Sequence, residues 1–439
     1  MTLSDCKDKK ILILGFGKEG KSTLAFLHRV FPHAHIGTLD KGDGPDYLAL
    51  QKNYDVAIRT PGIPKNLVTI PSTTATNIFF ECVRGITIGV TGTKGKSTTA
   101  SLIHAMLNAG GVKSHLVGNI GNPMLSELLL SNERDDVFVV ELSSYQLDDC
   151  AFSPHIAVFL NIFPDHMDYH GGMEEYMKAK ENIARHCSHF DFFVYNQNYS
   201  ALSEIAVQFP GKAIPFTPLE NSSWRAAGSI HSMPAQDVML RASSPGFINS
   251  GEFEEAPLLG AHNKENISAA ATVANLMGIS RAAQQAALSQ FKPLPHRLEF
   301  VGKYKQILFY DDAISTTPES TIAAMKSISP VGTILLGGAD RGYTFIALAH
   351  EIARRAIPNI VFFPDTGKKI KKEISAVAAV LPRMMETASM RDAVKFAYAV
   401  TLPDSLCMLS CASPSFSVWR DFEEKGNEFQ KWVKELGKQ

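Results

Sequence analysis

The sequence lacks a long apolar run, an excess of charge of one sign, a CxxC cysteine pair and a short-period repeat. Its first apolar run, Ile11 to Leu14, is too short for a signal peptide or a membrane span, so we expect a cytoplasmic protein without stable membrane insertion. The 43 basic and 44 acidic residues are interleaved and give a net charge of −1, which leaves no basic footprint for nucleic acid. Small molecules are therefore the expected partners.

The six cysteines include no CxxC pair, which favours reduced thiols over disulfides or a zinc knuckle. They are Cys6, Cys82, Cys150, Cys187, Cys407 and Cys411. The sequence also has no low-complexity segment. A length of 439 residues predicts roughly three domains, each large enough to bury its own core.

A run of small and basic residues, GVTGTKGKS from Gly89 to Ser97, lies between a strand-like apolar run and an amphipathic helical pattern. This setting is typical of a nucleotide triphosphate cradle, in which backbone N–H groups surround phosphate oxygens at the positive end of a helix. Lys96 would reach the β and γ phosphates, and the Ser97 hydroxyl would bind the accompanying Mg²⁺. A strict P-loop has its first glycine at the position of Val90, so a glycine-rich surface turn is the alternative interpretation.

Alternation of apolar runs with helical patterns predicts an α/β fold with three domains and mostly parallel sheets. We expect a Rossmann-like domain over residues 1–85, a P-loop domain over 86–292 and a Rossmann-like α/β domain over 293–439, with a proline-rich linker at 292–295. The Ser-, Gly- and Pro-rich stretch at 215–255 predicts short strands and loops. Strands are predicted at Ile11–Leu14, Ile36–Leu39, Val137–Val140, Ile156–Leu160, Ile307–Tyr310, Thr333–Leu336, Ile360–Phe363 and Leu406–Leu409.

The segment Gly15-Phe16-Gly17-Lys18-Glu19-Gly20 matches GxGxxG after a predicted strand, and Asp40 closes the next strand. This is the fingerprint of a dinucleotide site. The first domain, however, has half the size of a full dinucleotide fold, and the second domain already carries a nucleotide cradle, so one nucleoside diphosphate fits better than NAD. The turn would hold the diphosphate, and Asp40 would bind ribose hydroxyls or a base edge. A tight turn without a ligand is the alternative.

Polar residues follow two apolar strands of the second domain. Glu141 comes directly after Val137–Val140, and Asn161 and the segment Asp165-His166-Met167-Asp168 follow the next strand. Because carboxyl ends of parallel strands meet at one edge of a sheet, we expect these residues beside the phosphate cradle. Glu141 has the position of a Mg²⁺ carboxylate in an ATPase. His166 either contacts metal or phosphate or is a structural histidine.

Lys180 interrupts an apolar stripe on a predicted helix, whereas Lys178 points away from it. Helical spacing from the start of that helix places on one face Met173, Met177, Lys180, Ala184 and Cys187. Such a lysine either extends its ammonium group to solvent or has a special partner. A third possibility is that burial lowers its pKa and that it takes up CO₂ as a carbamate, which is an anionic metal ligand.

The order of these motifs resembles the Mur ligases over almost the whole chain. Besides the phosphate cradle, the resemblance is carried by Gly118–Gly121, Glu141–Leu147, Asp165–Asp168, Gly260–Asn266, Pro295–Arg297, Ser413–Phe416 and Asp421–Glu423. It implies an ADP-forming ligase in peptidoglycan precursor synthesis. The run ELSSYQL and the C-terminal motifs are similar to those of the members that join D-glutamate to UDP-N-acetylmuramoyl-L-alanine, and the resemblance implies ATP, two Mg²⁺ ions and carbamylated Lys180.

Each candidate residue takes its implied role from its position in the family motifs. The implied catalytic residues are Lys96, His166 and Lys180. The implied Mg²⁺ ligands are Ser97, Glu141, His166 and Lys180. The implied ATP contacts are Gly92, Thr93, Lys94, Gly95, Lys96, Ser97 and Thr98, with Asn266 at adenine, and Arg297 and Asp312. The UDP-sugar would be bound by Gly15, Phe16, Gly17, Lys18, Asp40 and Asn119. D-Glutamate would be bound by Thr316, Arg341, Ser415 and Phe422.

Two positions differ from the commonest family pattern. Arg341 stands where some relatives have lysine, and Ile314 occupies another lysine position, so D-glutamate would be bound with fewer cations. The alternative functions are another Mur ligase, a ligase similar to folylpolyglutamate synthase, and a non-catalytic nucleotide-dependent regulator. The regulator predicts loss of Lys96, Glu141 or Lys180, and all three are present. We expect a monomer.

Overall fold

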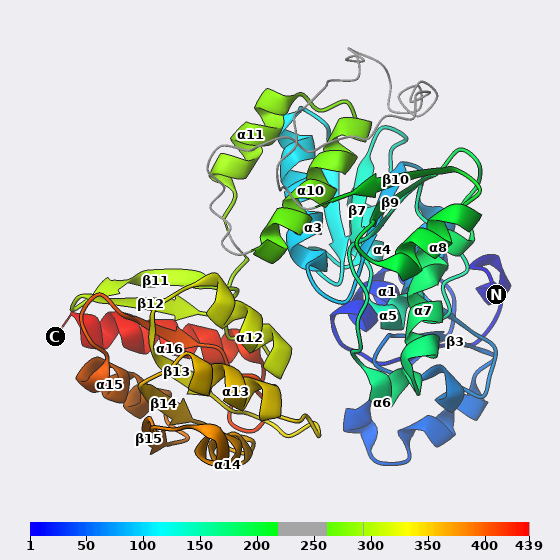
Figure 1. The fold of residues 1–439 in the computed structure, drawn as a ribbon. Coiled ribbons are helices and arrows are strands. Elements are labelled where there is room, and N and C mark those ends of the chain that lie inside the picture. Colours follow the sequence, from blue (N-terminus) through cyan, green and yellow to red (C-terminus); the bar gives the residue numbers. More distant parts are fainter. Residues whose placement is uncertain (218–260, 293, 439) are drawn as a thin grey trace. The chain divides into compact units, whose positions relative to one another are not determined.

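The computed structural model describes residues 1–217, 261–292 and 294–438. These residues contain three β-sheets in two compact units (Figure 1). The first unit comprises Met1–Ala256 and His262–Phe291, and the second comprises Pro257–Ala261 and Lys292–Gln439. The break after Phe291 adjoins the linker that the sequence predicts at 292–295.

The first sheet has four parallel strands in the order β2-β1-β3-β4. Its strands are β1 (Ile11–Leu14), β2 (Ile36–Leu39), β3 (Val56–Arg59) and β4 (Ser72–Thr74), with helices α1 (Lys18–Val30) and α2 (Ala75–Cys82) and 3₁₀ turns at Ser4–Cys6, Lys41–Asp43, Tyr47–Asn53 and Lys65–Leu67. β1 is buried along its whole length, as expected for an apolar run inside a parallel sheet. Because α1 starts just after β1, the glycine turn lies at the carboxyl edge of the sheet.

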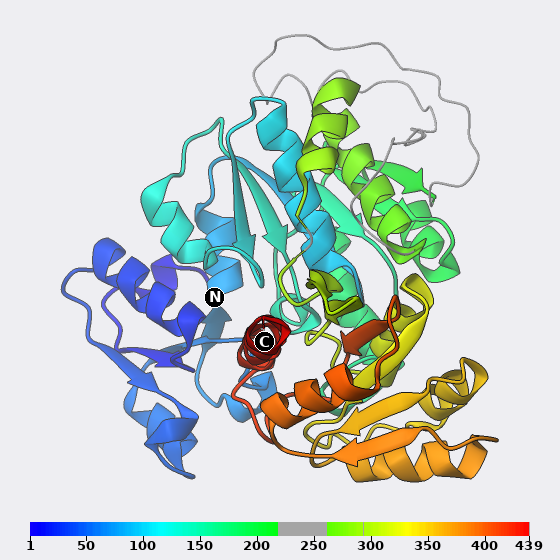
Figure 2. The same cartoon turned by 90° about the vertical axis from the view of Figure 1, so that its left-hand side faces the viewer.

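The central sheet has six parallel strands in the order β10-β9-β8-β5-β7-β6. They are β5 (Ile86–Thr91), β6 (Ser114–Gly118), β7 (Val137–Glu141), β8 (Ile156–Phe159), β9 (Phe192–Asn196) and β10 (Lys212–Phe216). The helices are α3 (Lys96–Ala109), α4 (Met124–Leu130), α5 (Ser144–Leu147), α6 (Met167–His170), α7 (Met173–Arg185), α8 (Ser200–Gln208), α10 (Ala261–Leu276) and α11 (Arg281–Gln290). Figure 2 shows α3 and α11 side by side. Because β5, β7 and β8 are neighbours, the loops after them meet at one edge.

One apolar core extends through both sheets of the first unit. Ile13 and Phe26 from the first sheet and its helix belong to the same buried cluster as Phe138 of the central sheet. A partly buried ion pair adds to this packing, because Arg59 at the end of β3 donates to Asp149 at 2.8 Å. The two sheets therefore form one packed body.

The second unit contains a six-stranded sheet in the order β11-β12-β16-β13-β14-β15. Its strands are β11 (Glu299–Tyr304), β12 (Ile307–Asp311), β13 (Val331–Leu336), β14 (Asn359–Phe362), β15 (Arg383–Glu386) and β16 (Leu406–Leu409). Its helices are α12 (Pro318–Ser327), α13 (Ile346–Arg354), α14 (Gly367–Val377), α15 (Met390–Val400) and α16 (Phe422–Gly437). Residues of α12, α13 and α14 form one apolar cluster with the sheet, and residues of α15 and α16 form another.

The strands predicted for this domain pair in parallel, and the sheet also contains one antiparallel edge strand, β11, which the sequence pattern does not predict. β11 pairs with β12 in antiparallel orientation, whereas the other pairings are parallel. The two strands are joined by Lys305 and Gln306, whose φ angles are 48° and 62°. Positive φ at both central residues gives a two-residue hairpin, a connection that parallel strands cannot use.

The α/β class with parallel sheets is confirmed, and each strand predicted from an apolar run is present. In the described part of the chain no helix is long and apolar enough to cross a membrane. Of the stretch at 215–255, the start belongs to β10 (Lys212–Phe216), and the residues from 218 on lie outside the described part, as does the beginning of the Gly260–Asn266 motif.

Candidate functional site

The glycine turn after β1 is shaped by close backbone approaches. Gly15 has a φ of +90°, and a Cβ atom there would lie 2.0 Å from Thr60 Oγ1. A Cβ on Gly20 would lie 2.1 Å from the carbonyl oxygen of Gly15. The backbone N–H of Phe16 donates to the Asp40 carboxylate. The structure therefore brings the predicted UDP-binding residues together, and it gives Asp40 an additional task, which is to hold the turn.

Gly17 and Lys18 complete this group at the start of α1. Gly17 occupies the N-cap position and Lys18 is the first helical residue. No side chain caps this helix, so its first backbone N–H groups are left for a ligand or solvent.

The phosphate loop after β5 is held in shape by Asn161, which follows β8. Asn161 Oδ1 accepts from the backbone nitrogen of Lys94 at 2.9 Å, and its Nδ2 donates to the Lys94 carbonyl at 3.0 Å. The backbone nitrogen of Thr93 donates to the Asn161 carbonyl at 3.0 Å. This clamp fixes the loop before any ligand binds.

Two glycines and a lysine define the inner surface of the loop. Gly92 and Gly95 have φ angles of +154° and +87°, which side chains rarely adopt. Lys96 Nζ donates to the carbonyl oxygens of Gly92 and Thr93 at 3.1 and 3.0 Å. The ammonium group therefore lies over the concave side of the loop, where phosphate oxygens would bind.

The helix that follows the loop directs the backbone N–H groups of its first turn toward the loop. α3 begins at Lys96, has Gly95 at its N-cap and carries no side-chain cap, so the N–H groups of Ser97 and Thr98 lie at its positive end. The Thr98 hydroxyl is buried and has no hydrogen-bond partner among the described residues. This arrangement suits a phosphate ligand.

Glu141, at the end of β7, has the environment of a metal carboxylate. Its side chain is 1% exposed, and its Oε1 accepts from Asn119 Nδ2 at 3.1 Å. Its Oε2 is buried without a hydrogen-bond partner in the described part of the chain. A buried carboxylate oxygen that lacks a partner is costly unless a cation joins it, so these residues fit Mg²⁺.

His166 directly follows Asp165, whose carboxylate contacts Lys94 of the phosphate loop. Asp165 Oδ2 is 3.2 Å from Lys94 Nζ. Burial lowers the pKa of His166, and the charges of Lys94, Lys96 and Lys180 act in the same direction, although Asp165 opposes them. A neutral imidazole is the form that binds metal. The side chain of Asp168 lies outside the described part.

Lys180 does not extend to solvent. Its side chain is 1% exposed, and Nζ donates to the Gly92 carbonyl at 2.8 Å and to Thr91 Oγ1 at 3.3 Å. Burial lowers its pKa well below the ordinary value, and the charge of Lys96 lowers it further, although Asp165 and Glu141 oppose this. Lys178 is exposed, as predicted, and it pairs with Glu174.

The face of α7 that carries Lys180 differs from the predicted one. Met173 is 37% exposed, and α7 ends at Arg185, before Cys187. The buried residues of α7 are Tyr176, Ala179, Lys180, Asn182, Ile183 and Ala184. The stripe is rotated because Tyr176, one turn before Lys180, packs inward and donates its hydroxyl to Thr93 Oγ1 at 3.1 Å.

Asn266, the predicted adenine contact, packs against the start of α3. Its Oδ1 accepts from Thr99 Oγ1 at 3.2 Å, and its Nδ2 donates to Asn263 Oδ1 at 2.9 Å. A Cβ atom on Gly95 would lie 2.2 Å from Asn266 Oδ1. The glycine is therefore required here by close approach as well as by its φ angle.

In the second unit, Arg297 and Asp312 lie near one another. Asp312 is buried, and its carboxylate accepts from Ser410 Oγ at 2.7 Å and from the backbone nitrogen of Leu298 at 3.2 Å. Burial raises the pKa of Asp312 to about 6, although hydrogen bonds and the charge of Arg297 oppose this. Arg297 Nε is buried and has no partner among the described residues. Both residues thus retain capacity for a polar ligand.

The four predicted amino-acid contacts lie at the carboxyl edge of this sheet. Thr316 follows β12, Arg341 follows β13, Ser415 follows β16, and Phe422 begins α16. Because β12, β16 and β13 are adjacent, these loops converge. The Ser415 hydroxyl is buried without a partner in the described residues, and the Arg341 guanidinium lies 5.8 Å from the centre of the Phe416 ring.

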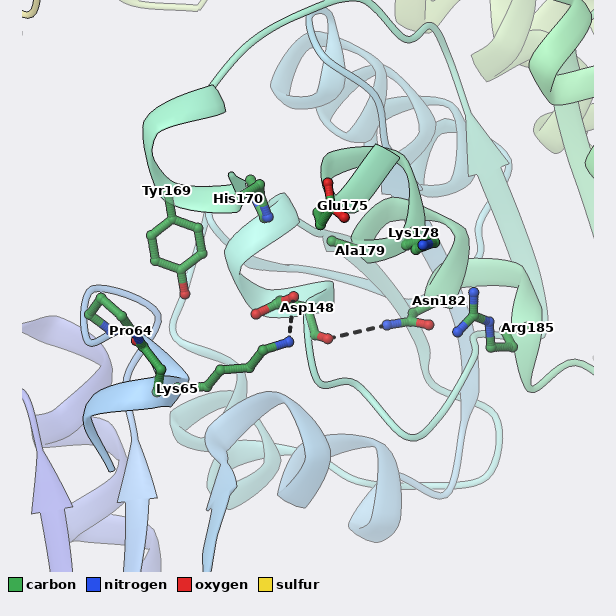
Figure 3. A pocket seen from close by; sticks show the side chains of 11 residues that line it. Pro64, Lys65, Asp148, Tyr169, His170, Glu175, Lys178, Ala179, Asn182 and Arg185 are labelled. Atoms are coloured by element: carbon green, nitrogen blue, oxygen red, sulfur yellow. Dashed lines mark hydrogen bonds and ion pairs between the residues drawn. The ribbon is translucent and has the colours of Figure 1, made fainter. Parts of the chain in front are cut away.

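A cavity of about 390 Å³ lies elsewhere in the first unit, beside α5 and α7 (Figure 3). Lys65 and Asp148 line it and form an ion pair at 2.9 Å. None of the site residues predicted from the sequence lines this cavity. It is therefore separate from the phosphate loop.

Sequence reasoning missed two residues that shape the phosphate site. Asn161 was expected at the edge, but not as the clamp of the loop. Tyr176 was not singled out, although it touches Thr93 and its ring centre lies 5.0 Å from Lys180 Nζ. Its spacing of four residues from Lys180 on a helix was the available signal.

Comparisons with known proteins agree with this geometry. The family model of the Mur ligase middle domain matches residues 90–274. The chain is 31% identical to the UDP-N-acetylmuramoylalanine–D-glutamate ligase of Acetivibrio thermocellus, over 98% of this chain and 97% of that protein. A solved UDP-N-acetylmuramate-alanine ligase, MurC from Thermotoga maritima, has a TM-score of 0.62 at 16% identity and covers 98% of this chain and 100% of its own.

A MurF ligase from Thermotoga maritima, solved in complex with ADP, has a TM-score of 0.59 at 16% identity, over 99% of this chain and 98% of that chain. At such low identity the two solved structures support the fold alone. The relative from Acetivibrio thermocellus aligns over nearly the whole of both chains. On that alignment the chain belongs to the Mur ligase family, in the branch of the UDP-N-acetylmuramoylalanine–D-glutamate ligases.

Proposed function

We propose that this chain is an ATP-dependent ligase that joins D-glutamate to UDP-N-acetylmuramoyl-L-alanine in peptidoglycan precursor synthesis. The observation that carries the proposal is that three features lie together at one edge of the central sheet. They are the phosphate loop held by Asn161, the Glu141 oxygen that has no hydrogen-bond partner among the described residues, and buried Lys180. We place this activity in the cytoplasm and assign it to a monomer.

Three substrates are assigned to three parts of the chain. Residues 1–85 bind the uridine diphosphate group, residues 86–292 bind ATP and the muramoyl group, and residues 293–439 bind the amino acid. Support comes from the position of the candidate residues at the carboxyl edge of each sheet. Within the third part, the open hydroxyl of Ser415 and the guanidinium of Arg341 suit a carboxylate.

The reaction brings anions together, and the residues at the phosphate loop counter their repulsion. The carboxylate of the muramoyl-alanine attacks the γ-phosphorus of ATP, the bond to the bridging oxygen breaks, and ADP leaves with formation of an acyl phosphate. Lys96 stabilises the negative charge that develops on the transferred phosphoryl group. The uncharged amine of D-glutamate then attacks the acyl carbon, phosphate leaves, and the amine loses a proton. The chain supplies orientation and electrostatics and needs no nucleophile of its own.

Ser97, Glu141, His166 and Lys180 would hold two Mg²⁺ ions, which supply positive charge next to the phosphates when bound. The unpaired oxygen of Glu141 and the neutral form favoured for His166 support this set. Lys180 contributes to the set after carbamylation, in which its uncharged amine adds to CO₂ and releases a proton. Lys180 is buried and contacts the Gly92 carbonyl of the phosphate loop, which supports this assignment, because an ammonium group there would repel a metal ion.

Phosphate release is the direct test of the proposed reaction. We expect release only when UDP-N-acetylmuramoyl-L-alanine, ATP with Mg²⁺ and D-glutamate are all present. Omission of any one should leave only background release. Equal rates with L-glutamate or D-alanine would place the chain in another branch, and no release with any amino acid would favour a non-catalytic regulator.

Asp40→Ala is expected to raise the KM for the UDP-sugar by about 10-fold or more, because a charged hydrogen-bond acceptor is lost from the turn. The KM for ATP should stay close to the wild-type value, since the phosphate loop belongs to another sheet. Asp46→Ala, at an exposed position with the same charge, is the matched control. A selective rise of the KM for ATP in Asp40→Ala would show that the GxGxxG turn has been misassigned.

A further inference from the structure

Lys425, in the first turn of α16, is a buried cation without a matching anion. Its exposed fraction is 0%, and Nζ donates to the carbonyl oxygen of Gly337 at 3.3 Å. The centre of the Trp419 ring lies 4.9 Å from Nζ. Within the described part of the chain no carboxylate lies within ion-pair distance of this ammonium group. Such a charge destabilises the fold unless something else compensates it.

The thiol of Cys411 also contacts Lys425, but it does not neutralise the charge. Burial raises the pKa of Cys411, although the charge of Lys425 and a hydrogen bond from it oppose the rise. The thiol therefore stays protonated at neutral pH. The ammonium group thus has a carbonyl oxygen, a protonated thiol and the rings of Trp419 and Phe363 as neighbours, and each partially solvates it. The carboxylates of Asp311 and Asp312 also act on the Cys411 thiol, but neither forms an ion pair with Lys425 among the described residues.

The loops above Lys425 are fastened to one another. The backbone nitrogen of Gly337 donates to the Cys411 carbonyl at 2.8 Å, and that of Ala339 donates to the Pro414 carbonyl at 2.7 Å. A Cβ atom on Gly338 would lie 2.0 Å from the Pro414 oxygen, so the two loops touch backbone to backbone. A charge held beneath one loop therefore acts on both.

These loops carry the candidate amino-acid contacts. Arg341 lies four residues after Gly337, Ser415 directly follows Pro414, and Phe422 begins the helix that contains Lys425. The Ser415 hydroxyl is buried and has no hydrogen-bond partner among the described residues, so this edge offers a polar position for a ligand. The positive charge of Lys425 lies beneath the same loops. An anionic ligand is the missing partner that such a field favours.

We propose that Lys425 is a positioning residue that fixes the loops of Gly337 and Ser415 and places a positive charge beneath them, so that the site selects an amino acid with two carboxylates. This proposal rests on the proposed function, because it takes the carboxyl edge of this sheet as the amino-acid site. It assigns selectivity for a dicarboxylate to a residue that does not itself touch the substrate.

The test compares Lys425→Met, Lys425→Arg and the control Lys434→Met, which removes a lysine from an exposed position of the same helix. For each full-length variant, the KM for D-glutamate, ATP and the UDP-sugar is measured by phosphate release, and Tm is measured by thermal unfolding. We expect Lys425→Met to raise the KM for D-glutamate by about 10-fold, as expected for one unit charge acting through a protein interior. Lys425→Arg should stay within about 3-fold of wild type, since its charge is kept.

The Tm distinguishes this role from a purely structural one. Methionine has a similar length and no charge to desolvate, so Lys425→Met should have an unchanged or higher Tm together with the weaker binding of D-glutamate. A lower Tm with parallel changes in all three KM values would contradict the proposal, and so would a variant that fails to fold. An unchanged KM for D-glutamate would do the same. Absence of D-glutamate-dependent release in the wild type would instead refute the proposed function itself.

Discussion

Lys96→Ala is expected to lower kcat by at least about 10²-fold, because it removes the cation closest to the charge that develops during phosphoryl transfer. In the structure the Lys96 ammonium group lies over the concave side of the loop and bonds to two of its carbonyl oxygens. It would exchange these contacts for phosphate oxygens when ATP binds. The measurement is steady-state phosphate release at saturating concentrations of all three substrates.

Two controls separate this effect from damage to the fold. Lys178→Ala removes an exposed lysine that pairs with Glu174, and it should keep wild-type turnover. The Tm of Lys96→Ala should stay near that of the wild type, because Asn161 holds the loop through its own hydrogen bonds. Near-normal turnover by Lys96→Ala would mean that ATP binds at another place.

Lys180→Ala is expected to be almost inactive and to regain activity when acetate or formate is added. Truncation would remove the proposed carbamate and leave a space beside Thr91, Gly92 and Tyr176. A small carboxylate that enters this space would restore the missing negative charge. Phosphate release is measured against carboxylate concentration, with Lys178→Ala as the control on the same helix.

The proposed carbamate can also be tested by a measurement that does not depend on activity. After incubation with ¹³C-labelled bicarbonate, the wild type should show a carbamate carbon signal by NMR, and Lys180→Ala should lack it. An unmodified Lys180 that only supports the loop through Gly92 predicts no signal and no rescue by carboxylates. That combination of results would rule out the modified lysine.

Local sequence patterns predicted much of the fold because they report on local physics. The four apolar residues of β1 and the glycines after it dictate a buried strand and a tight turn, whatever the rest of the chain does. β15 was missed because Arg383–Glu386 has no apolar run and lies at the edge of its sheet. The hairpin between β11 and β12 was missed because Lys305 and Gln306 are not the glycine and asparagine that usually signal such a turn.

The candidate site could be predicted only in part, for a related reason. Strand ends place Glu141 and the phosphate loop at one edge, which topology alone suggests. The clamp by Asn161 and the contact of Tyr176 with Thr93 depend on how side chains from distant segments meet. The same holds for Lys425, whose burial beneath two loops no spacing rule reveals. The contacts of these residues with ligands stay predictions.

The core shared by the first two sheets ties ligand binding to cooperative unfolding. Ile13, Phe26 and Phe138 belong to one buried cluster, and Arg59 pairs with Asp149 across the two parts. Elements that share a core in this way unfold together, so the free energy of a ligand bound at either sheet is added to the stability of both. A nucleotide sugar on the glycine turn would thus protect the phosphate loop against thermal opening, and occupancy of the loop would protect the turn by the same linkage.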